Sequence, residues 1–275
     1  MIRDIVVSLS LGTPRDASGD FAMSVATAVE AHLSGVAFAY EPIVGSMMLP
    51  VADASLLDAF RTGNRRAADR ARQNFDDATR RSGVLADSTV ITATADEAAE
   101  RFGQIARDFD LSIVPQAQPD GDIAETLVIE AALFGSGRPV LVVPYIQSTG
   151  LKLDRVMVCW DGSRSAARAV GDAMPLLRRA GAIEVVTIET RERRNEVAGA
   201  KIAEHLARHG LNIELKPIVA PDVEVAETIL SHVADASVDM IVMGGYGHSR
   251  LREFVLGGAT DSILRSMTVP TLMAH

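Results

Sequence analysis

A glycine-rich segment near the end of the sequence, residues 243–260, holds the residue types best suited to binding a ligand. It follows apolar residues 240–243, which predict a strand, and it runs into the expected start of a helix. Gly244 and Gly247 can adopt backbone angles that other residues avoid, and Gly257 and Gly258 precede the helix. Free amides and the positive dipole end of a helix attract anions. The segment therefore predicts a site for phosphate groups.

A carboxylate is expected beside this segment. Asp161 follows apolar residues 156–160, which predict the first strand of the second half of the chain. In a sheet with strand order 3-2-1-4-5, the first and fourth strands flank the point where the order reverses, and ligands bind at their carboxyl ends. Asp161 could then accept a hydrogen bond from a ribose hydroxyl or an adenine amine, and Gly162 leaves room for the ligand.

Three basic side chains lie inside the glycine-rich segment of an acidic chain: His248, Arg250 and Arg252. They could reach phosphate oxygens, and arginine is favoured for this by its forked donors. They could equally be solvated loop residues, and the sequence leaves both interpretations open.

The spacing of Gly244, two residues, Gly247, nine residues and Gly257 resembles the nucleotide loop of the universal stress protein family. Asp161 falls where that family has its first-strand aspartate, and residues 269–273 resemble its last strand. The resemblance implies a stress-response regulatory module that binds ATP, with or without Mg, or another adenine nucleotide. The residues expected to contact the nucleotide are Asp161, Gly162, Met243, Gly244, Gly247, His248, Arg250, Gly257, Gly258, Ala259 and Thr260.

Both halves depart from the family pattern. ATP-binding members follow the last glycine with Ser or Thr, whereas this chain has Gly258, so Thr260 would have to supply the hydroxyl. The loss of one neutral hydrogen bond costs about 0.5–1.5 kcal/mol, which weakens binding rather than abolishing it. In the first half, Ser10 replaces the aspartate and residues 115–120 replace the glycine loop, with Asp120 and Asp122 repelling phosphate. We therefore expect no independent ATP site in the first half.

An internal repeat organises the elements that position these residues. Residues 5–10 align with 156–161, 110–115 with 239–244, and 138–143 with 269–274. The alternation of strand and helix patterns between them favours right-handed βαβ units. We expect two tandem Rossmann-like doubly wound α/β domains over 1–147 and 151–275, each with a five-stranded parallel sheet of order 3-2-1-4-5. Strands of the second are expected near 155–160, 183–188, 212–219, 238–243 and 270–274.

The resemblance further implies that the fifth strands, 140–143 and 271–274, pair across a pseudo-twofold axis and cover each other's sheet edges. Whole chains could in addition form a homodimer. The first half is enlarged by a broken apolar loop over 41–52, either an interface lid or core filler, and by a charged helix over 53–82 with Gly63 as a break.

Composition limits the remaining functions. A formal net charge of −9 and a pI near 5.2 argue against broad affinity for nucleic acid or anionic membranes. A single cysteine, Cys159, fits a reducing compartment, and no long apolar run is present, so we expect a cytoplasmic protein. Motifs of hydrolases and Walker-type NTPases are missing. A slow ATP hydrolase or phosphotransferase and a ligand-free scaffold remain the alternatives.

Two further patterns have ordinary explanations. His205 and His209 have the helical spacing of a metal pair, yet a solvated helix end explains them better. Trp160 could stack on a base or pack in the core, and Cys159 is expected to be a buried structural thiol.

Overall fold

The computed structural model describes residues 1–12, 15–42, 54–118, 121, 123–189, 199–219, 224–246 and 258–275. The first half contains β1 (Asp4–Ser8), α1 (Ala17–Val29), β2 (His32–Tyr40), α2 (Ala54–Ser82), β3 (Ala86–Ala93), α3 (Ala95–Ile105), the 3-10 turn η1 (Ala106–Asp108), β4 (Leu111–Pro115), α4 (Ile123–Glu130), the π-helical turn η2 (Ala131–Gly135) and β5 (Val140–Val143). The second half contains β6 (Arg155–Cys159), α5 (Arg164–Leu177), β7 (Ala182–Glu189), α6 (Ala200–Arg208), β8 (Ile213–Val219), α7 (Val225–Asp235), β9 (Met240–Gly244), α8 (Ala259–Ser266) and β10 (Thr271–Ala274).

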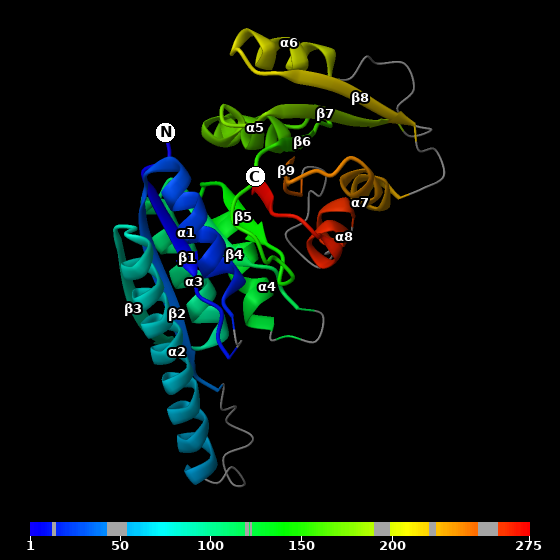
Figure 1. Cartoon of the computed structure of the whole chain (residues 1–275). Coiled ribbons are helices and arrows are strands. Elements are labelled where there is room, and N and C mark those ends of the chain that lie inside the picture. The colour runs from blue at the N-terminus through cyan, green and yellow to red at the C-terminus, as the bar shows by residue number, and fades with distance from the viewer. Residues whose placement is uncertain are drawn as a thin grey trace.

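The strands form one ten-stranded sheet in the order β3-β2-β1-β4-β5-β10-β9-β6-β7-β8. Counted within each half, this is the expected order 3-2-1-4-5, and the five strands of each half are parallel. The expected pairing of the fifth strands is also present, because β10 and β5 are antiparallel neighbours with Leu272 opposite Leu141. The two predicted sheets are thus continuous through this central pair (Figure 1).

Helices cover both faces of the sheet. Side chains of α1, α2, α5 and α6 pack in one apolar cluster, and those of α3, α4, α7 and α8 pack in the other. Central strands such as β5 and β10 are buried along their whole length, since they have helices on both sides. This arrangement follows from right-handed crossovers, which place successive helices on one face until the strand order reverses.

The halves differ most in their second helix. The expected charged helix of the first half is α2, and it continues through Gly63 without the break suggested by the sequence. It has 29 residues, whereas its counterpart α6 has nine, and its first turns project beyond the sheet (Figure 1). The apolar loop expected at 41–52 lies outside the described residues from residue 43 onward.

Several smaller expectations can be compared with the structure. His205 and His209 stack edge to face with ring centroids 4.8 Å apart, and the described residues contain no group of three or more side chains placed to hold a metal ion. Trp160 packs against the apolar cluster of α5. Across the described residues, no helix combines the length and apolar character needed to span a bilayer.

One buried acid lies between the strands of the second half. Glu184 of β7 is 1% exposed, forms an ion pair with Arg155 of β6, and has Oε2 2.7 Å from Nε2 of His232 on α7. Burial by itself would raise the pKa of Glu184, but the bonds to His232 and Arg155 outweigh burial and hold this pKa below its usual value. Glu184 is therefore charged in the folded protein at neutral pH.

This contact predicts a specific pH dependence. A carboxyl whose pKa is lowered by folding stabilises the protein above its unfolded pKa of about 4.5, and the contribution is lost as pH falls through the folded pKa. Glu184→Gln should lower the free energy of unfolding at pH 7 by about 1–3 kcal/mol, with the difference from wild type shrinking below pH 4.5. Urea unfolding at several pH values measures this, with Glu214→Gln, at an exposed pair with Lys216, as the control. A difference that stays constant with pH would contradict the assignment.

Candidate functional site

The carboxyl ends of β6 and β9 meet because the two strands are parallel neighbours, with Val156 opposite Met240. A Cβ added to Gly244, the last residue of β9, would lie 2.5 Å from the backbone nitrogen of Ala166 and 2.6 Å from Oγ of Ser165. The start of α5 therefore packs directly on the end of β9. This close approach requires a glycine at position 244. The sequence suggested an unusual backbone angle instead, but φ of Gly244 is not positive.

Asp161 follows β6 and is exposed at this edge. Its Oδ1 accepts a hydrogen bond of 2.9 Å from the backbone N–H of Ser163, and Oγ of Ser163 in turn accepts from the backbone N–H of Ala166 at 3.1 Å. The aspartate is thus oriented by the N-terminus of α5. Gly162 between them has φ +76°, and a Cβ added there would have no atom within 4 Å.

The start of α8 forms the other side of this edge. Gly258 has φ +105° and is its N-cap, and without a side chain it cannot cap the first-turn amides of Ala259 and Thr260. Oγ1 of Thr260 accepts a 3.2 Å hydrogen bond from the backbone N–H of Tyr246, and the Thr260 side chain is largely buried. A hydroxyl that accepts one bond still has its hydrogen to donate.

Not every predicted residue can be placed in this way. The side chain of Met243 is buried in the core on β9, so only its backbone faces the strand end. Gly247, His248, Arg250 and Gly257 lie outside the described residues, as do Asp120 and Asp122 of the first half. The described part of the site therefore consists of the loop after β6, the end of β9 and the start of α8.

Burial raises the pKa of three ionisable groups near this edge. Burial, and after it the charge of Asp161, raise the pKa of Cys159 to about 12, which makes it an unreactive thiol as expected. Burial, followed by the charges of Glu130 and Asp261, raises the pKa of Tyr246 to about 12. Burial and the charge of Asp261 also raise the pKa of Glu130. None of these three groups adds a negative charge as readily as it would in water.

The first half contributes directly to the same region. Tyr246 has φ +50° and its ring lies 5.1 Å from that of Phe134 on the turn η2. A Cβ on Gly245 would lie 2.7 Å from Cδ2 of Leu133, also on η2. The sequence did not single out these contacts, because they join residues more than 100 positions apart. The exit from β9 is thus shaped by the other half.

Gln116 makes the reciprocal contact at the exit from β4. Its Nε2 donates to the carbonyl oxygens of Leu264 and Arg265 at the C-terminal end of α8, at 2.9 and 3.1 Å. Its Oε1 accepts from the backbone N–H of Tyr145 at 3.3 Å, and the side chain is 1% exposed. The residue that stands in the first half where Gly245 stands in the second therefore ties the two halves together.

The loops after β1 and β6 carry the same two groups in exchanged order. In the second half a carboxylate, Asp161, follows the strand and a hydroxyl, Ser163, caps the helix. In the first half Ser10 follows the strand, and Asp16 caps α1 and accepts from the backbone N–H of Ser10 at 3.3 Å. Burial raises the pKa of Asp16 despite bonds from Gly19, Ser18 and Ser10 that lower it. The first half has therefore moved its acid into the helix cap.

Comparison with known proteins agrees with this architecture. Residues 152–275 match the model of the universal stress protein family. The C-terminal half belongs to the universal stress protein family. A universal stress protein of Synechocystis is 27% identical over 171 residues, which cover 60% of this chain and 58% of that protein. The chain therefore spans less than two thirds of the length of this curated relative.

Solved structures extend the fold similarity to the first half. A universal stress protein from Archaeoglobus fulgidus has a TM-score of 0.68 at 15% identity, covering 98% of this chain and 95% of its own. A putative universal stress protein from Pseudomonas aeruginosa has a TM-score of 0.61 at 13% identity, covering 98% of this chain and 92% of its own. The universal stress protein fold thus extends over both halves.

The contacts of Gln116 predict a large effect on stability. Gln116→Ala should lower the free energy of unfolding by about 2–4 kcal/mol, because it leaves buried carbonyl and amide groups unpaired between the halves. Gln118→Ala, two residues away at an exposed position, should change it by less than about 0.5 kcal/mol. Thermal and urea unfolding measure both variants, and equal stability of the two would contradict the proposed role of Gln116.

Proposed function

We propose that this universal stress protein binds an adenine nucleotide, ATP with or without Mg, in its C-terminal half, and that occupancy regulates its role in the stress response. The observation that supports this most directly is the packing of the α5 start on Gly244. It lies beside the Asp161 carboxylate, the open turn at Gly162 and the start of α8, where Gly258 has no side chain to act as a cap, at the edge where doubly wound sheets bind ligands.

The roles of the groups follow from their chemistry. Asp161 accepts a hydrogen bond from a ribose hydroxyl or the adenine amine. The hydrogen bond from the backbone N–H of Ser163 already fixes the orientation of its carboxylate. The amides of Ala259 and Thr260, together with the positive end of α8, bind phosphate oxygens. The hydroxyl of Thr260 donates to the phosphates and replaces the Ser or Thr that is absent at Gly258.

Regulation requires that occupancy changes something outside the site. The exit of β9 contacts η2 through Gly245 and Tyr246, and α8 contacts Gln116, so the described residues on both sides of the glycine loop contact the first half. A ligand that binds one arrangement of the loop more tightly shifts the protein toward that arrangement. Nucleotide binding in one half would thus change the surface that both halves present to a partner.

Calorimetry with ATP tests this function. Gly247→Val should weaken binding by at least about tenfold if the glycine loop holds the phosphates. Thr260→Val should weaken it up to about tenfold, the value of one hydrogen bond, while Thr228→Val on α7 should bind like the wild type. Unfolding temperatures of all variants identify a loss that is only structural. Equal affinities of the wild type and Gly247→Val would refute the proposal.

A further inference from the structure

A cavity lies in the first half, between α1 and α2 on one face of the sheet, and it reaches the loop that follows β1. It has a volume of about 620 Å³ and is lined by the loop after β1, the first two turns of α1 and residues 67–81 of α2. This volume falls within the range of about 300–1,000 Å³ typical of small-molecule sites. We call it the α1–α2 cavity.

The sequence explains why α1 and α2 leave this space. Phe75 packs α2 onto β2 so closely that a Cβ on Gly35 would lie 2.8 Å from its Cε1 atom. The cavity wall of α2 carries alanines at one-turn and two-turn spacing, Ala67, Ala71 and Ala78, where larger side chains would fill the gap. Phe75 thus sets the distance between α2 and the sheet, and the small alanines leave a space between α2 and α1.

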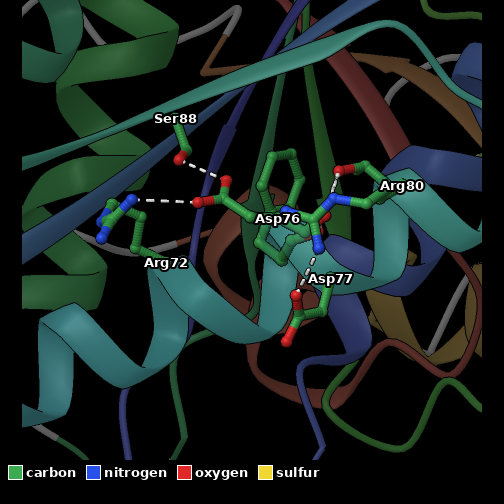
Figure 2. A network of polar contacts seen from close by, with 7 residues as sticks. Arg72, Asp76, Asp77, Arg80 and Ser88 are labelled. Atoms are coloured by element: carbon green, nitrogen blue, oxygen red, sulfur yellow. Dashed lines mark hydrogen bonds and ion pairs between the residues drawn. The ribbon is translucent and has the colours of Figure 1, made fainter.

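The acids of the cavity wall already have partners. Asp16 accepts from Ser10, Gly19 and Ser18, and Oδ2 of Asp20 lies 2.7 Å from Nε of Arg15. Asp77 is paired with Arg80 at 2.8 Å, as Figure 2 shows beside the separate pair of Arg72 with Asp76. Asp20 and Asp77 are therefore ion-paired within the protein, and Asp16 is hydrogen-bonded to neutral donors.

Two arginines of the same wall are not compensated. Among the residues that the structure describes, Arg70 and Arg81 form no ion pair, although both line the cavity. They stand on one side of α2, with Asn74 between them as a further donor. In a chain with a formal net charge of −9, two uncompensated guanidinium groups around one cavity make a local site for anions.

The spacing of these arginines indicates the shape of the ligand. Eleven residues separate them along the helix, or roughly 16 Å at 1.5 Å per residue, and their long side chains can each reach inward. Guanidinium forks bind phosphate oxygens in pairs. We propose that the α1–α2 cavity binds a small metabolite with phosphate groups at both ends, its uncharged middle resting on the alanines, Met23 and Phe75.

This site is independent of the proposed nucleotide site. No residue of its wall belongs to the second half, and it uses neither the exit of β4 nor residues 115–120. The expectation that the first half has no ATP site rests mainly on residues 115–120, Asp120 and Asp122, and of the residues behind it only Ser10 lines this cavity. The helix that forms one wall of the cavity also differs between the halves, because α6 has nine residues where α2 has 29.

An NMR titration of the full chain with fructose 1,6-bisphosphate tests the proposal, read at the backbone amides of Gly12 and Gly19 in the cavity wall. Saturable shifts of both amides are expected. The double variant Arg70→Gln, Arg81→Gln should weaken binding by about tenfold or more, since each charged hydrogen bond contributes substantially. Arg66→Gln, an exposed position of α2 outside the wall, should bind like the wild type.

Three further arms make the outcome decisive. Ala71→Leu should fill the hollow and abolish the shifts while the unfolding temperature is retained. Fructose, which has no phosphate, should produce no shift, and Gly247→Val should bind the bisphosphate normally even if it no longer binds ATP. The proposal is overturned if the bisphosphate gives no saturable shift at millimolar concentrations, if fructose matches it, or if the double variant or Gly247→Val departs from these results.

Discussion

The antiparallel pairing of β5 with β10 is the constraint on which the rest of the molecule depends. It covers the edge that each five-stranded sheet would otherwise expose, and it fixes where the exits of β4 and β9 lie relative to the opposite half. Gln116 can reach the end of α8, and Gly245 must remain small beside Leu133, only because this strand pair sets their separation. A substitution at the exit of β4 or β9 should therefore alter contacts with the opposite half.

Within this common frame the halves have diverged in the placement of charge. The second half exposes Asp161 after the strand end and uses Ser163 for the helix cap. The first half places Asp16, which is partly exposed, in the cap, where it accepts hydrogen bonds from Ser10 and Gly19. The carboxylate and the hydroxyl thus exchange places: the carboxylate follows the strand in the second half and caps the helix in the first.

The sequence predicts the fold well, because the periodic apolar pattern and the repeat determine local elements and their parallel order. The strands expected in the second half correspond to β6 through β10, and α2 was expected over almost its observed length. Contacts between distant segments leave no such pattern. The close approach behind Gly244, the role of Gln116 and the space beside Ala71 depend on how helices pack, so no local signal in the sequence identifies them.

An acidic protein can bind an anion only where its own acids are neutralised or turned away. At the exit of β9 burial keeps Tyr246 and Glu130 from adding charge readily, and the amides at the start of α8 supply partial positive charge without a cation. In the α1–α2 cavity Asp20 and Asp77 are ion-paired with other arginines and Asp16 is hydrogen-bonded to neutral donors, so Arg70 and Arg81 have no ion pair among the described residues. The site at the exit of β9 suits a ligand that is bound by backbone amides, and the α1–α2 cavity suits an anion that is bound by long arginine side chains. Two different electrostatic solutions in one chain follow from the divergence of its two halves.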